Sequence, residues 1–187
     1  MNFTCTTCGA EHDLHSISFG SDAPDQWTRL SEEERNRSEL GGEQCVIETS
    51  DGTHYFIRAC LEIPIIGREQ PFSWGVWCSL SETSFLEMSQ HWHDSGRTSL
   101  GPYFGWLCTR VPEYPETMFM KTKLHQRAVG MRPLVELEES NHLLSIHQSQ
   151  GIREQDMQRI VSRLLHARMP NNALQPTCET HAAERRR

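Results

Sequence analysis

The stretch that decides the fold reads Cys45-Val-Ile-Glu-Thr-Ser-Asp51-Gly52-Thr-His-Tyr-Phe-Ile-Arg-Ala-Cys60. An Asp-Gly pair between two runs of apolar residues is typical of a two-residue β-hairpin turn. With these two residues as the turn, the register that follows sets Thr49 opposite His54, Ile47 opposite Phe56 and Cys45 opposite Arg58. Side chains alternate along a strand, so one face of the sheet receives Cys45, Ile47, Phe56, Arg58 and Cys60. Cys45 and Cys60 then become diagonal neighbours on that face.

The segments outside this hairpin continue the pattern. The second strand extends to Ile63, and residues 72–80 predict a third strand with Trp74, Val76, Cys78 and Leu80 on one face. Ser31 and Ser81 are expected to cap helices. A strand over residues 103–108, weaker strands over 118–123 and 134–138, and a final helix over 152–167 complete the list of expected elements.

This order of elements favours an α+β domain over residues 1–168, in which a mostly antiparallel sheet packs against two or more helices. Residues 1–42 form a knuckle and a polar segment that we expect to pack on this domain. Residues 169–187 lose hydrophobic periodicity, and we expect a disordered C-terminal tail.

Composition and charge exclude several classes of function. The chain has 187 residues, 36% of them hydrophobic, and a net charge of −7. No basic stripe interleaved with aromatic residues is present, which argues against a nucleic-acid partner. No apolar run is long enough for a membrane helix, and the first residues do not resemble a secretory signal. The seven cysteines are odd in number and scattered, which favours a reducing compartment and a cytoplasmic location.

A zinc-knuckle-like motif stands at the start of the chain, where Cys5 and Cys8 are three residues apart and Gly9 follows. This spacing places two thiolates on one tetrahedral zinc ion. The candidates for the remaining ligands are His12, Cys45 and Cys60, because the hairpin puts the last two on one face. Such a closed set would make the zinc structural. The alternatives are an empty knuckle, cysteines that pack as small apolar residues, and a redox pair.

Histidines and carboxylates gather between residues 125 and 147. Within this segment His125, Glu136 and Glu138 are the weak candidates for acid–base catalysis. The alternative is a sheet edge that carries solvated charge. Cys78 and Cys108 are available thiols, but both stand in apolar strands, and we interpret them as core residues.

Four aromatic residues are the candidates for a binding face: Trp74, Trp77, Tyr103 and Trp106. They come from two strands with alternating directions, so they cannot all face one core. Those on the second face either form an exposed patch, which would mark a site for a protein or a small ligand, or lie under helices.

The chain resembles a bacterial family known only as a domain of unknown function, DUF2199. The resemblance rests on several segments taken in order: Phe3-Thr-Cys-Thr-Thr-Cys-Gly9 with His12, Cys60-Leu-Glu-Ile-Pro64, Trp74-Gly-Val-Trp-Cys-Ser-Leu-Ser81, Pro102-Tyr-Phe-Gly-Trp106, Lys121-Thr-Lys-Leu-His125 and Arg132-Pro-Leu-Val-Glu-Leu-Glu138. It covers about residues 1–168 and implies no activity. Separately, Asn172-Ala-Leu-Gln-Pro-Thr177 resembles translated recombination-site sequence from a mobile bacterial gene cassette.

These observations favour a non-enzymatic binding protein that carries a structural zinc ion and engages an unknown protein or small ligand. The acidic charge suits a basic partner. The alternative is a small hydrolase or transferase that uses the histidines and carboxylates of residues 125–147. A third interpretation is a homodimer that buries the aromatic face.

Overall fold

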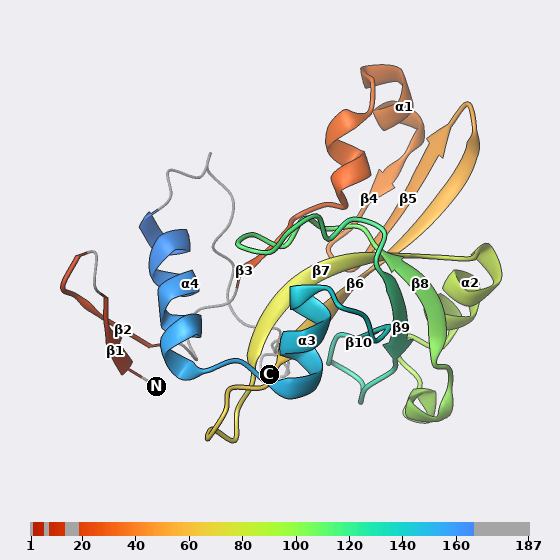
Figure 1. Ribbon diagram of the computed structural model, residues 1–187. Coiled ribbons are helices and arrows are strands. Elements are labelled where there is room, and N and C mark those ends of the chain that lie inside the picture. The colour runs from red at the N-terminus through yellow and green to blue at the C-terminus, as the bar shows by residue number, and fades with distance from the viewer. Residues whose placement is uncertain (1, 6–7, 14–18, 167–187) are drawn as a thin grey trace, which may run out of the picture.

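The hairpin forms at the expected place, but its register differs by two residues from the prediction. The computed structural model describes residues 2–5, 8–13 and 19–166, and its chain path is drawn in Figure 1. Strands β5 (Gln44–Thr49) and β6 (Gly52–Ile63) pair Thr49 with Gly52, Ile47 with His54 and Cys45 with Phe56. The turn residues are therefore Ser50 and Asp51. A shift of two residues keeps each side chain on its predicted face, so Cys45, Ile47 and Phe56 still lie together.

The main sheet closes on itself. Its strands follow the order β3 (Phe19–Gly20), β7 (Phe72–Leu80), β8 (Tyr103–Leu107), β9 (Lys121–His125), β10 (Leu134–Leu137), β6, β5 and β4 (Glu39–Leu40), and β7 also pairs with β6. Strands β6 to β10 thus form a ring. The pairing is mostly antiparallel, except that β3 runs parallel to β7 and β10 runs parallel to β6. The predicted mostly antiparallel sheet is accordingly a mixed, closed sheet.

Two glycines allow close approaches within this sheet. A Cβ atom on Gly105 in β8 would lie 2.5 Å from the backbone oxygen of Ser79 in β7. Gly75 in β7 pairs with Gly20 in β3, where a side chain on either residue would press on the other backbone. Gly105 therefore needs the smallest residue for steric reasons, whereas at Gly75 and Gly20 an added Cβ atom would make a tight contact of 3.3–3.4 Å.

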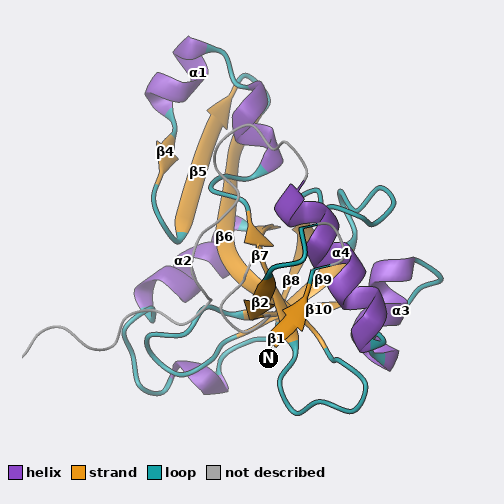
Figure 2. Cartoon of the chain, turned by 90° about the vertical axis from the view of Figure 1, so that its left-hand side faces the viewer, coloured by secondary structure: helices purple, strands orange, loops and turns teal. Residues whose placement is uncertain are grey.

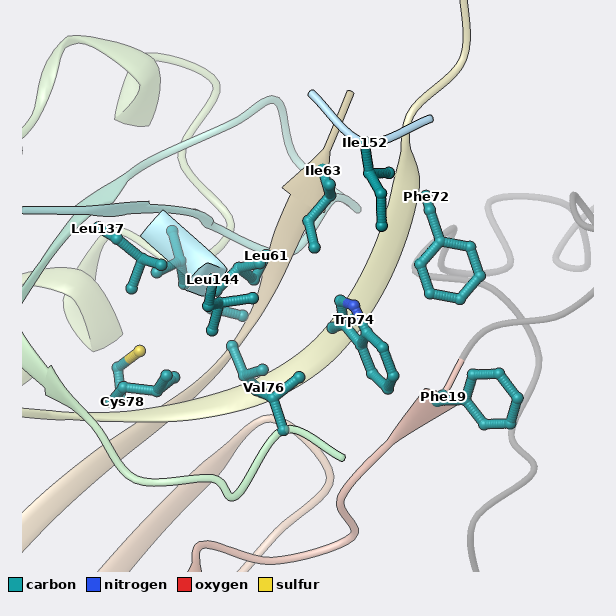
Figure 3. Packing of buried hydrophobic residues seen from close by; sticks show 14 of the residues in the cluster. Phe19, Leu61, Ile63, Phe72, Trp74, Val76, Cys78, Leu137, Leu144 and Ile152 are labelled. Atoms are coloured by element: carbon teal, nitrogen blue, oxygen red, sulfur yellow. The ribbon is translucent and has the colours of Figure 1, made fainter. Parts of the chain in front are cut away.

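The main core fills the inside of the ring and the space between the sheet and the helices. The predicted inward face of β7 is confirmed, because Trp74, Val76, Cys78 and Leu80 are all buried in this cluster. Figure 3 shows Trp74 between Phe72 and Phe19, with Ile152 above it. Three aromatic rings of the core therefore gather where β3 joins β7.

Within the described residues four α-helices accompany the sheet, and Figure 2 shows how they are arranged around it. The helices α2 (Glu82–Gln90) and α4 (Glu154–His166) were expected, and Ser81 caps α2 as predicted. The helix α3 (Leu143–Gln150) was not expected. Its N-cap is His142, whose ring nitrogen accepts the Leu144 N–H, and histidine is not a usual capping residue.

A second, smaller core lies on the other face of β6 and β7. Residues Cys45, Ile47, Phe56, Trp77 and Cys108 form it, with Trp27 and Leu30 packed against it. The covering segment comprises the 3-10 helix η1 (Asp25–Arg29), which carries Trp27, and Leu30 directly after it. The helix α1 (Glu32–Arg37) follows and has no buried residue. Ser31 and Glu34 make the predicted capping box at the start of α1.

The remaining elements complete the described chain. Strands β1 (Asn2–Thr4) and β2 (Glu11–Asp13) form a separate antiparallel hairpin, and η2 (Arg97–Ser99) is a second 3-10 helix. The strand predicted over 118–123 begins later, at Lys121. In residues 2–5, 8–13 and 19–166, no helix has the length and apolar character needed to cross a membrane. The predicted tail of residues 169–187 lies outside the described residues.

Candidate functional site

The N-terminal hairpin brings three metal-ligating side chains together. The loop between β1 and β2 turns tightly, because the Cys5 N–H donates to the Ala10 carbonyl oxygen at 2.8 Å and the Gly9 N–H donates to the Cys5 carbonyl oxygen at 2.9 Å. Gly9 has φ +71°, a left-handed conformation that glycine adopts without a steric penalty. His12 pairs with Phe3 across the hairpin and thus lies beside this loop.

A fourth side chain, His166, reaches the loop from the last turn of α4. Its Nε2 atom lies 3.2 Å from the Sγ atom of Cys5, while the Cys8 Sγ atom lies 3.5 Å from Nε2 of His12. One ligand atom from each of the four residues falls within 4.8 Å of the other three. In Figure 1 the red β1–β2 hairpin and the blue α4 lie side by side, although they come from opposite ends of the sequence.

Two of the distances within this group suit a tetrahedral metal site. Zinc–sulfur and zinc–nitrogen bonds of about 2.3 and 2.05 Å give a sulfur-to-nitrogen edge of about 3.6 Å in a regular tetrahedron. The two sulfur-to-nitrogen distances in the group, 3.2 and 3.5 Å, are close to that value. Two thiolates and two imidazoles supply all four positions, so such a site has no position left for a substrate or a water molecule. Cys5 is buried and Cys8 is exposed, which leaves the ion an entry path from solvent.

Cys45 and Cys60 do not belong to this ligand group. Cys45 is buried in the second core beside Trp77, and burial raises the pKa of its thiol to about 12. A thiol with so high a pKa is a poor source of the thiolate that a metal needs. Cys60 is fully buried in β6, where its N–H donates to the Pro133 carbonyl oxygen at 2.8 Å. The hairpin therefore puts these two cysteines on the main sheet, away from the knuckle.

Sequence reasoning missed His166 as the fourth member. Its separation from Cys5 is 161 positions, so no spacing motif connects the two residues. The only local signal was a histidine at the end of a strongly amphipathic helix, where a positively charged side chain is usual for electrostatic reasons alone.

His125 and Glu136 form a close pair. The His125 Nε2 atom lies 2.7 Å from a carboxylate oxygen of Glu136 across the β9–β10 ladder. Both residues line a cleft of about 730 Å³ between the edge of β10 and α3. Glu138 is not part of this arrangement, because its carboxylate pairs with Lys121 at 3.2 Å. The structure thus brings together two of the three predicted catalytic candidates.

The four predicted binding aromatics do not form an exposed face. Trp74, Trp77 and Tyr103 are buried, with exposed fractions of 2%, 0% and 6%. Trp77 lies under the covering segment, where its indole N–H donates to the Ser21 carbonyl oxygen at 2.9 Å. Only Trp106 is exposed, at 39%. Of the two alternatives, burial therefore holds for Trp74, Trp77 and Tyr103, because β7 is covered on both faces and β8 on one, and only Trp106 stays available for an exposed binding face.

The thiols of the main sheet are inert by their surroundings. Cys78 and Cys108 are both buried, and desolvation raises the pKa of each thiol above its ordinary value. The Cys108 Sγ atom also accepts a hydrogen bond from the Gln26 amide at 3.2 Å. Neither residue has the electropositive, accessible setting of a catalytic cysteine, which confirms their interpretation as core residues.

The fold and the site define a class of protein: a closed mixed sheet packed with α-helices and an N-terminal cysteine–histidine group able to hold a metal ion. A family model for uncharacterised proteins conserved in bacteria, DUF2199, matches residues 4–152. The chain belongs to this family. The matched segment contains Cys5, Cys8 and His12 but ends before α4 and His166. Among curated proteins and among solved structures, no match was found.

Proposed function

We propose that this protein is a non-enzymatic binding protein in which a structural zinc ion ties the N-terminal hairpin to α4. The observation that carries the proposal is the four-ligand group of Cys5, Cys8, His12 and His166. Zinc is the metal that this donor set and size favour, because thiolate and imidazole ligands in a tetrahedron are typical of structural zinc.

The surroundings of the group support a structural role. The hairpin strands have three residues each, and two such strands alone are marginal in water. Phe3 and Cys5 are nevertheless buried in the main core. A metal ion that joins the hairpin to α4 would hold these residues in place, as zinc does in other small elements without a sufficient core of their own.

The test is the metal content of the full chain purified without chelator, beside a Cys5→Ser/Cys8→Ser double variant. We expect one zinc ion per wild-type chain and none in the variant. Cys45→Ser provides the matched control, since it removes a buried cysteine outside the group and should keep the metal. No zinc in the wild-type chain would overturn the proposal and return Cys5 and Cys8 to the alternatives of an empty knuckle or a redox pair.

Cobalt substitution then separates a structural site from a catalytic one. Tetrahedral coordination by two thiolates gives cobalt intense visible bands and a thiolate charge-transfer band. If all four positions are protein ligands, azide or imidazole should leave these bands unchanged. Spectral changes on addition of these small ligands would indicate an open coordination position and would favour catalysis at the metal.

A second candidate function is a small hydrolase or transferase that uses the His125–Glu136 pair. The pair favours this alternative because a carboxylate can orient an imidazole for acid–base work, and a cleft lies beside it. The expected result for an enzyme is hydrolysis of a chromogenic ester or phosphate that His125→Ala abolishes. Glu138→Gln is the matched control, because Glu138 pairs with Lys121 instead.

A further inference from the structure

An exposed aromatic groove lies beside the second core. Strand β8 directs Phe104 and Trp106 outward, and their rings meet edge to face with centroids 5.3 Å apart. Beside them, the aromatic groove has a volume of about 720 Å³, and five of its apolar lining residues define it here: Leu30, Ile47, Phe56, Trp106 and Phe119. Phe119 is 60% exposed. Large exposed rings around a hollow are typical of binding sites, since burying them on a partner is favourable.

Phe119 occupies a backbone position where glycine is the usual residue. Its φ is +61°, in the left-handed region that a bulky side chain rarely adopts. The Phe119 N–H donates to the Leu107 carbonyl oxygen at 2.8 Å, and the Leu107 N–H donates to the Met120 carbonyl oxygen at 2.8 Å. Two residues of one chain segment thus face a single residue of β8, which is a bulge. The bulge thus holds the exposed Phe119 ring at the groove in a strained backbone conformation. Backbone strain that is kept at one position is typical of a functional site.

The floor of the groove is apolar and its rim is acidic. Ile47 and Phe56 belong to the second core and are nearly fully buried. The rim carries the carboxylates of Glu34 and Asp51 and a single arginine, Arg29, which Asp25 neutralises at 2.9 Å. In the described part of the chain, Asp51 forms no ion pair. The groove therefore combines an apolar floor with a net negative rim.

We infer that the aromatic groove docks a segment of another protein that carries an aromatic or aliphatic anchor beside a basic side chain. The anchor fills the space between Trp106 and Phe119, while the base faces Asp51 and Glu34. This inference rests on the proposed binding function and names its surface and its partner class. The net charge of −7 favours the approach of such a basic segment.

The experiment is a selection of random dodecapeptides, displayed on phage, against the zinc-loaded full chain. We expect the enriched sequences to pair an aromatic or aliphatic residue with a nearby lysine or arginine. A synthetic peptide of the enriched sequence is then titrated against variants by fluorescence polarisation. Phe119→Gly should weaken its binding at least about tenfold, as loss of a central anchor does. Asp51→Asn should weaken it less and should reduce the dependence of the affinity on salt.

Two controls keep folding apart from binding. Glycine suits the left-handed position, so Phe119→Gly should unfold at the same temperature as the wild type or above it. Ile66→Ala removes an exposed apolar side chain outside the groove, at a residue that is 58% exposed, and should bind the peptide normally.

Each other outcome overturns the inference. Enriched peptides that bind Phe119→Gly as tightly as the wild type would place binding elsewhere and leave the proposed function standing. Enriched acidic peptides would contradict the charge argument. If no peptide is enriched, the groove is not a docking surface for such segments. The zinc measurement is independent of all three results, so it shows separately whether the structural metal site fails.

Discussion

The replacement of His166 by alanine tests the long-range role of the candidate metal site. The expected loss of stability can be worked out from the chain separation. Cys5 and His166 are 161 positions apart. An ion that joins them acts as a cross-link, and the loop-closure entropy for a loop of this length amounts to about 5 kcal/mol at 25 °C.

A second route to the magnitude applies if the ion leaves on unfolding. Ligand linkage then contributes about 4 kcal/mol when free zinc exceeds its dissociation constant by a thousandfold. For a chain of this size each kcal/mol shifts Tm by about 2–4 °C. Both routes therefore predict that His166→Ala lowers Tm by about 8–20 °C in the presence of zinc.

The assay is thermal unfolding of wild type and variant, each with zinc and with excess chelator. His93→Ala provides the matched control, because His93 is an exposed histidine outside the ligand group. Chelator should lower Tm of the wild type and of this control, and it should affect His166→Ala much less. Equal Tm values for wild type and His166→Ala in zinc would refute the reasoning, as would a wild type that does not respond to chelator.

Three further predictions concern residues that stabilise the fold outside the candidate sites. Arg97 is buried and donates hydrogen bonds to three backbone carbonyl oxygens. In urea denaturation Arg97→Met should therefore lower the free energy of unfolding by about 3–5 kcal/mol. A loss of less than about 1 kcal/mol would contradict this role of Arg97. Gly105→Ala would put a Cβ atom 2.5 Å from the backbone oxygen of Ser79, so we expect a lower Tm and weaker hydrogen-exchange protection in β7 and β8. Gly42→Ala is the control and should have a small effect, because no atom lies within 4 Å of the added Cβ. Burial lowers the pKa of His147 below 6.5. The unfolded chain therefore binds the additional proton more readily, and the free energy of unfolding falls as pH drops below 6.5. In denaturation measured against pH, His147→Gln should reduce this fall in stability, and an unchanged fall would show that another group causes it.

The strands and helices with strong patterns could be predicted from the sequence. Strand β7 has the predicted bounds, because alternating large apolar residues end at a serine that caps the next helix. The hairpin register was wrong by two residues. Thr49 accounts for the difference: its hydroxyl accepts the Asp51 N–H at 3.2 Å, which tightens the turn around Ser50 and Asp51. Local side-chain hydrogen bonds of this kind are not visible in a periodicity pattern.

The candidate site could be predicted only in part, for a different reason. Cys5, Cys8 and His12 lie within eight positions, so their spacing carries the signal. His166 joins them only because α4 packs beside the hairpin, which is a tertiary contact. The same limit applies to the aromatic residues. Alternation showed that Trp77 and Trp74 face opposite ways, but it did not show that Trp27 of η1 packs against the core that contains Trp77.

The closure of the main sheet has a consequence for self-association. An open sheet ends in two rows of unpaired backbone groups, which can recruit a strand from another chain and start aggregation. Here the ring leaves β3 and β4 as the outermost strands of the main sheet, and each has only two residues. Little backbone is thus available for strand addition at either end. If the predicted homodimer forms, we expect its contact to come from side chains and not from strand pairing at β3 or β4. Polar substitutions on an exposed face should then separate the two copies, whereas proline substitutions in β3 or β4 should not.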